Sequence, residues 1–233
     1  MTTPSRRIAL PLLTALLVIA GLGAVVPRAA VAASSSCFPT TDSTISGPGD
    51  FTDSTDGSGT GDVSIESGPT TTEGTGLLRW TARQAVAGNT GGPGATMSGD
   101  LTFTVTLNGR SVSFASSCIL EAGVFAGESE DDPFDPELTH TAVRGIEGEW
   151  IGTAYNFPAS GQQTKVVASL AVWTTSVGPR YHLDVSTGDF SGAGCPLESD
   201  ANGSVSSGGP TGSPSRVNVT APDMQAGYGS CAT

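Results

Sequence analysis

The stretch Leu101–Phe114, LTFTVTLNGRSVSF, predicts a β-hairpin, because large apolar residues alternate with threonines before a short turn. Asn108 and Gly109 form that turn, since both central positions of a type I′ turn need positive φ, which Asn and Gly tolerate. A two-residue turn sets the register of the strands and places Phe103 opposite Phe114. The apolar residues then share one face, so we expect a half-buried antiparallel sheet.

Alternating segments elsewhere predict further strands, and no stretch shows sustained helical periodicity with caps. In Val166–Thr174 apolar residues lie on both faces, which indicates a strand buried on both sides. In Glu149–Phe157 we expect Tyr155 and Phe157 on one face and Trp150 on the other. Short strands joined by Gly and Pro turns predict an all-β, antiparallel β-sandwich, with a β-barrel as the alternative.

All four cysteines follow the apolar leader of the chain: Cys37, Cys118, Cys195 and Cys231. Export makes two disulfides the expectation, and the wide spacings contain no CxxC metal or redox motif. The pairing that closes the shorter loops is Cys37–Cys118 with Cys195–Cys231, although all three pairings stay open. Continued alternation past Phe114 places Cys118 on the Phe114 side of the sheet, where we expect a buried disulfide.

Residues 1–32 have the features of a secretory signal peptide. Arg6 and Arg7 precede an apolar run over Ile8–Val26, and Ala30–Ala32 is a small-residue cleavage site. An uncleaved membrane anchor is the alternative, because the run approaches the length that spans a membrane. The small residues after the run favour cleavage, so we expect a secreted, extracellular protein without membrane contact.

The chain is acidic, with a formal net charge of −12, and loss of the leader removes only basic residues from that balance. An acidic surface repels nucleic acid and anionic membranes, so neither is an expected partner. Cations are the natural counterpart, and solubility outside the cell is a sufficient reason for the charge. The expected partner is an extracellular protein or a glycan.

Three segments of the mature chain are predicted to have little regular structure, apart from a short strand over Val63–Ile65. Residues 33–75, rich in Ser, Thr, Gly and Asp, predict a flexible N-terminal region before an antiparallel β domain over 76–233. Residues 199–215 predict a flexible loop within that domain. The run ESEDDPFDPE over 128–137 predicts an exposed acidic loop, because its prolines exclude a helix or an inner strand. Calcium is conceivable near these acids, but the EF-hand spacing fails and no cofactor is expected.

Catalytic signatures are missing from the sequence. A serine-hydrolase triad needs an imidazole base, and the chain has two histidines, His140 and His182. Neither belongs to a signature, since no Gly-x-Ser-x-Gly elbow and no HExxH motif occurs. His182 and Asp184 share one face of a predicted strand, as on an ordinary polar strand face. We assign no catalytic residue and no metal ligand, while paired carboxylates that hydrolyse glycosides stay an alternative because acids are abundant.

Gly148-Glu149-Trp150, at the start of a predicted strand, resembles the Gly-x-Trp signature of lipocalin- and avidin-like barrels. Too few residues follow it for a complete barrel of that layout. Together with the doubly apolar strand, the resemblance implies a small-ligand carrier as a further alternative.

The predicted export and the missing catalytic signatures favour a non-enzymatic extracellular binding or surface-interaction module. The secreted hydrolase and the small-ligand carrier are the alternatives. Tryptophans anchor β-sandwich cores more often than they contact ligands, yet aromatic and acidic side chains are the best contact candidates. These candidates are Trp150, Tyr155, Trp173, Asp131, Asp132 and Asp135.

Overall fold

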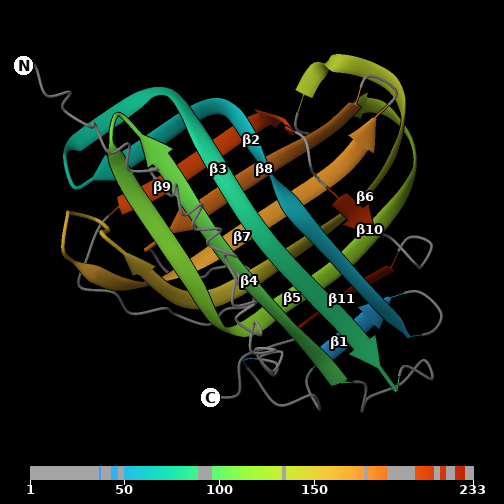
Figure 1. Cartoon of the computed structure of the whole chain (residues 1–233). Helices are drawn as coiled ribbons and strands as arrows, with labels where there is room; N and C mark the ends of the chain where they lie inside the picture. Colours follow the sequence, from blue (N-terminus) through green and yellow to red (C-terminus); the bar gives the residue numbers. More distant parts are fainter. Residues whose placement is uncertain are drawn as a thin grey trace, which may run out of the picture. The chain divides into compact units, whose positions relative to one another are not determined.

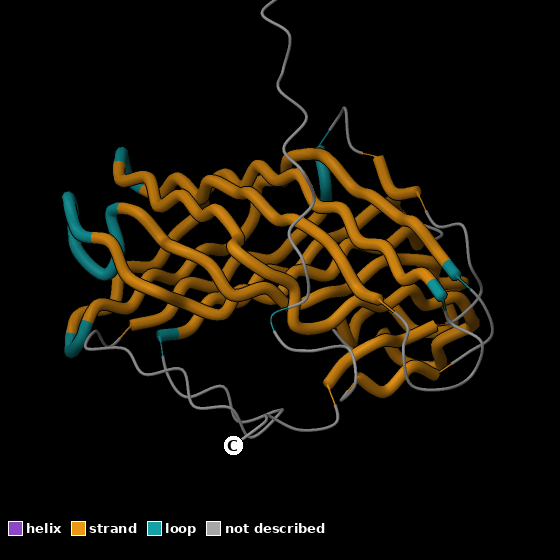
Figure 2. The backbone as a smooth tube through the Cα atoms, turned by 90° about the horizontal axis from the view of Figure 1, so that it is seen from below, coloured by secondary structure: helices purple, strands orange, loops and turns teal. Residues whose placement is uncertain are grey.

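The computed structural model describes residues 37, 43–46, 50–88, 96–132, 135–175, 178–187, 203–212, 216–218 and 224–228. All the described residues lie within Ala33–Thr233. Strands account for nearly all of the described backbone (Figure 2). Within these residues no helix is long and apolar enough to cross a membrane.

Eleven strands occur in the described part of the chain, and the pairings between them are antiparallel (Figure 1). They are β1 Ser43–Ser46, β2 Phe51–Ser67, β3 Thr70–Ala87, β4 Thr96–Leu107, β5 Arg110–Asp132, β6 Asp135–Tyr155, β7 Gln163–Thr175, β8 Gly178–Ser186, β9 Gly203–Pro210, β10 Arg216–Asn218 and β11 Met224–Tyr228. The predicted all-β antiparallel class is confirmed.

Eight of these strands pair in one closed ring. The order is β5-β4-β3-β2-β9-β8-β7-β6, and β6 pairs again with β5. The remaining strands lie beside the ring, since β11 pairs with β5, β1 with β11, and β10 with β2. Pairing therefore runs through one continuous sheet, and the predicted sandwich arrangement is not confirmed.

The hairpin predicted over Leu101–Phe114 is confirmed, with its register. Phe103 pairs with Phe114, and their rings stack at a centroid distance of 5.1 Å and an interplanar angle of 12°. Asn108 and Gly109 adopt φ of 51° and 80°, as a type I′ turn requires. This hairpin joins β4 to β5 in the ring.

One apolar cluster takes side chains from all eight strands of the ring and lies on their inward faces. Successive side chains of a strand point to opposite faces of the sheet, so buried and exposed positions alternate. In β4, for example, Leu101, Phe103 and Val105 are buried. Trp80 and Tyr181 meet across this core at a centroid distance of 5.3 Å. Burying one such large side chain stabilises the fold by about 1.5–3 kcal/mol.

The predicted Cys37–Cys118 disulfide is confirmed, but Cys118 lies on the other face from Phe114. The register between β5 and β6 shifts between Ser116 and Cys118, and such a bulge inserts a residue that reverses the alternation. Cys118 consequently packs against an outer apolar cluster of Leu120, Ile151 and Val167. The bridge is compatible with an extracellular or otherwise oxidising compartment. Cys195 and Cys231 lie outside the described residues.

Two segments predicted to be flexible contain strands. β2 and the start of β3 occupy residues 51–75 of the predicted N-terminal region, and β9 lies within the predicted loop 199–215. Few inward positions of these strands carry large apolar residues, with Phe51, Val63 and Ile65 in β2 and Val205 in β9. The Ser, Gly and Thr residues between them hid the period of two, so the strands extend well beyond the short Val63–Ile65 strand that the sequence predicts.

The acidic run 128–137 also differs from the prediction, because β5 and β6 extend into it. The backbone pairs Asp131 with Thr139 and Asp132 with Asp135, which leaves an irregularity that contains Pro136. A proline at such an irregularity breaks no ladder hydrogen bond, so the strands tolerate it. The three aspartates of this run lie near the tip of the β5–β6 hairpin, and their side chains are outside the described set.

Strand β6 confirms the prediction that Trp150 and Tyr155 lie on opposite faces, but Phe157 departs from it. Trp150 and Ala154 belong to the inner core, while Tyr155 is 39% exposed at the end of the strand. Phe157 is nevertheless buried in the core, because Asn156 takes a positive φ of 57° and turns the chain after the strand ends. The prediction treated Phe157 as a continuation of the strand alternation. The prediction for β7 is confirmed, since apolar residues are buried on both of its faces.

Replacing Cys37 and Cys118 together by serine should lower the free energy of unfolding by about 4 kcal/mol, because the bridge restricts a long loop of the unfolded chain. The sequence separation of the two cysteines is 81. Urea unfolding followed by tryptophan fluorescence measures the change. Thr71→Ala, at an exposed position of β3, is the control and should stay within about 0.5 kcal/mol of the parent. An unchanged midpoint for the double variant contradicts the stabilising role.

Candidate functional site

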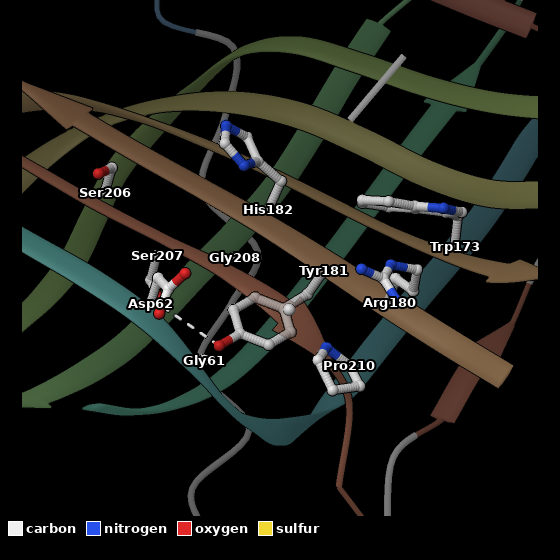
Figure 3. A pocket seen from close by; sticks show the side chains of 11 residues that line it. Gly61, Asp62, Trp173, Arg180, Tyr181, His182, Ser206, Ser207, Gly208 and Pro210 are labelled. Carbon is white, nitrogen blue, oxygen red and sulfur yellow. Dashed lines mark hydrogen bonds between the residues drawn. The ribbon is translucent and has the colours of Figure 1, made fainter. Parts of the chain in front are cut away.

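A hollow of about 460 Å³ lies on the outer face of β2, β9, β8 and β7, and we call it the Gly208 groove (Figure 3). Small-molecule sites commonly have volumes of about 300–1,000 Å³. The ring brings its lining together from distant parts of the chain: Gly61, Asp62, Trp173, Arg180, Tyr181, His182, Ser206, Ser207, Gly208, Gly209 and Pro210.

The floor of the groove consists of glycines on β2 and β9. A Cβ on Gly61 would lie 2.0 Å from the Gly208 carbonyl oxygen, and Gly209 has a φ of +151°, so the fold itself requires both glycines. Gly208 differs, because a Cβ there would meet His182 Nδ1 at 3.4 Å and the Tyr181 oxygen at 3.7 Å, which are ordinary contacts. The sheet has room for a side chain at Gly208 and carries none.

Polar side chains surround this floor. Among the described lining residues the formally charged groups are the Asp62 carboxylate and the Arg180 guanidinium, with His182 and the Ser206 hydroxyl near them. Trp173 pairs with Arg180 across β7 and β8, and Figure 3 shows their side chains next to each other at one end of the groove. Hydrogen-bond donors and acceptors are therefore both present.

His182 and Asp184 share the outer face of β8, as predicted. His182 Nε2 lies 2.7 Å from Asp184 Oδ2. This hydrogen bond raises the pKa of His182 and outweighs the opposing effect of burial. Because the folded-state pKa is raised, the pair stabilises the fold below the ordinary histidine pKa, and the gain disappears as pH rises through the folded value.

A smaller hollow of about 190 Å³ adjoins the groove, with which it shares His182. It contains Glu121, Glu147 and Glu149, and Glu121 on β5 pairs with Glu149 on β6. Burial, followed by repulsion from Glu121 and Glu147, raises the pKa of Glu149 to about 7. Among the described residues, no group of three or more His, Cys, Asp or Glu is arranged to hold a metal ion.

The residues predicted to contact a ligand lie in different parts of the structure. Trp150 is 1% exposed in the inner core, and its Nε1 has no hydrogen-bond partner within the described chain. Trp173 is 2% exposed but lies on the outer face, where it forms a wall of the Gly208 groove. Tyr155 is exposed outside the groove lining, so its contact role stays a prediction. The roles of Asp131, Asp132 and Asp135 also stay predictions.

Sequence reasoning missed Arg180, Ser206 and Gly208 as site residues. Ser206 and Gly208 fell in the predicted loop, and Arg180 is a single cation next to a turn. The tripeptide Gly208-Gly209-Pro210 was the available signal, because glycine within a strand marks close backbone approach.

No family model matches the chain, and no match to it was found among curated proteins or among solved structures. The chemistry of the outer face is therefore the guide to function.

Glu149→Gln should stabilise the protein at high pH and leave it unchanged at low pH. Above about pH 7 the folded state bears the cost of an ionised Glu149 in its hollow, and below about pH 4.5 the carboxyl is neutral in both states. Stability therefore falls as pH rises from 4.5 to 7 in the parent. The variant should gain about 1–2 kcal/mol at pH 8, allowing for solvent screening.

Urea unfolding of parent and variant at pH 4 and pH 8 measures this difference. Glu66→Gln, at an exposed position of β2, is the matched control and should leave the dependence on pH as in the parent. An equal effect of Glu149→Gln at both pH values contradicts the assignment.

Proposed function

We propose that the protein is a secreted, non-enzymatic binding module whose contact surface is the Gly208 groove. Gly208 carries this proposal, because it is a strand residue with ordinary φ and with room for a side chain. Glycine inside a strand costs about 0.5–1 kcal/mol relative to alanine. Such glycines are found where a ligand approaches the backbone, which is the use we assign to this one.

Export is supported by the leader pattern of residues 1–32 and by the Cys37–Cys118 disulfide. The partner is then an extracellular protein or a glycan. The formal net charge of −12 disfavours nucleic acid and anionic membranes.

We also propose that the ring is a β-barrel and not a sandwich. The continuous pairing of eight strands supports this choice. Barrels with about eight strands have an interior that side chains can fill. The large apolar cluster on the inward faces supports a filled interior, which disfavours the small-ligand carrier and favours an outer contact surface.

A secreted hydrolase is the second candidate, favoured by the carboxylates next to the groove. Opposed residues of neighbouring strands have Cβ atoms about 4.5–5.5 Å apart, as expected for Glu121 and Glu149. With a pKa of about 7, Glu149 retains a proton near neutral pH and is suited to act as a general acid. Glu121 or Glu147 would then be the second carboxyl group of a glycosidase pair.

Gly208→Leu should abolish binding of small fragments in the groove with little change in stability, because the new side chain fills the floor from a position that tolerates a Cβ. The measurement is a screen of polar and aromatic fragments by ¹⁵N-resolved NMR. We expect hits that shift the amide resonances of Gly208, Ser206 and His182 in the parent and lose these shifts in the variant.

Thr102→Leu is the matched control, because it adds the same side chain at an exposed position of β4, four strands away from β8 in the ring. This control should retain every hit. Fragment shifts that map elsewhere, or that survive Gly208→Leu, contradict the proposed contact surface.

The two candidate functions give different results in a hydrolysis assay with polysaccharides and aryl glycosides. A binding module releases no product even at high protein loading. The hydrolase candidate requires product, with a rate that falls about a hundredfold or more in Glu149→Gln and is retained in the exposed control Glu66→Gln. Product with that pattern would replace the binding proposal.

A further inference from the structure

The charge of the Gly208 groove is balanced among its described residues. Asp62 supplies one negative charge and Arg180 one positive charge, while His182 is held by the Asp184 carboxylate. Charge complementarity determines which partners bind, so a groove without net charge does not favour a strongly charged ligand. An uncharged ligand fits this balance best.

The hydrogen-bonding groups of the Gly208 groove include both donors and acceptors. Arg180 only donates, the Asp62 carboxylate only accepts, and the Ser206 hydroxyl does both. A ligand that meets all three needs groups that both donate and accept, which is the property of hydroxyls. A ligand with several hydroxyls that point in different directions can form hydrogen bonds with Arg180, Asp62 and Ser206 at the same time.

The shape of the floor selects a flat ligand body. Gly208 leaves the backbone of β9 uncovered, and Pro210 and Trp173 lie at the edge as rigid apolar groups. Trp173 is 2% exposed, so it acts as a wall and not as a stacking platform. A saccharide ring has an apolar C–H face that packs on such a surface, and it has hydroxyls around its rim.

The neighbouring hollows set the length and charge of the ligand. One hollow is shared through His182 and contains three glutamates, and another is shared through Asp62 and Ser206 and contains Glu73. A ligand that continues past the groove in either direction meets carboxylates, which repel uronic acids and sulfated sugars. The adjoining hollows accommodate a chain longer than one sugar.

We propose that the Gly208 groove binds a neutral oligosaccharide, with the ring of one sugar on the Gly208 floor and its hydroxyls on Asp62, Arg180 and Ser206. This inference rests on the proposed binding function and names its ligand class. Acidic glycans are excluded by the flanking carboxylates, and a basic peptide is the competing partner that the experiment must separate.

The test is isothermal titration calorimetry of the full secreted chain with tetra- to hexasaccharides of glucose, mannose and N-acetylglucosamine. Oligogalacturonate and hexalysine are the charged comparison probes. We expect at least one neutral series to bind, with affinity unchanged between 50 and 500 mM salt because no net charge is neutralised. Asp62→Ala should weaken that affinity about tenfold, and Gly208→Leu should abolish it while Thr102→Leu retains it.

Binding of hexalysine alone, weakening with salt, overturns the inference in favour of a basic peptide. Failure of all neutral saccharides, while fragments still occupy the groove in the NMR screen, overturns the ligand class and leaves the proposed function standing. Failure of the fragments as well overturns both. Saccharide binding that survives Gly208→Leu places the ligand elsewhere and also overturns the inference.

Discussion

The pairing of β5 with β6 is the contact on which the ring depends, because without it the eight strands would form an open sheet with two bare edges. This pairing extends from Ser113 opposite Tyr155 to Asp132 opposite Asp135. Bulges in β5 change which residues face outward, and such bulges also bend a strand. They place Glu121 on the outer face opposite Glu149, so ring closure also builds the acidic hollow next to the groove.

The parts of the fold that sequence predicted well are those with large inward side chains. The β4–β5 hairpin and the double burial of β7 followed from alternation, and the register followed from the Asn108-Gly109 turn. The parts that it missed have small or polar residues at inward positions. In β2 the inward residues include Asp53 and Thr55, both 1% exposed, so a hydrophobic period of two was hardly visible there. The composition of residues 51–75 and 203–210 indicated loops, but these residues form strands that pair with neighbouring strands of the sheet.

The candidate site was less predictable, because its geometry is long-range. His182 and Asp184 were placed together correctly, since two residues of one strand share a face. Asp62 and Gly208 meet only because β2 pairs with β9, and no local pattern links such distant segments. The Gly-x-Trp motif has a packing role that sequence did not specify. A Cβ on Gly148 would lie 2.5 Å from the Trp150 ring, so this glycine makes room for a core tryptophan.

The β2–β9 pairing also determines when the ring can be completed during synthesis. Residues Asp62–Ser67 pair with Gly203–Gly208, so β2 waits for a strand that is made much later in the sequence. Pairing across such a separation carries a large loop-closure entropy and makes folding slow. Until β9 is synthesised, β2 and β8 keep backbone edges on which other chains can add. The ring therefore closes only after residues 203–208 have been made, and truncation before residue 203 leaves those edges permanently open.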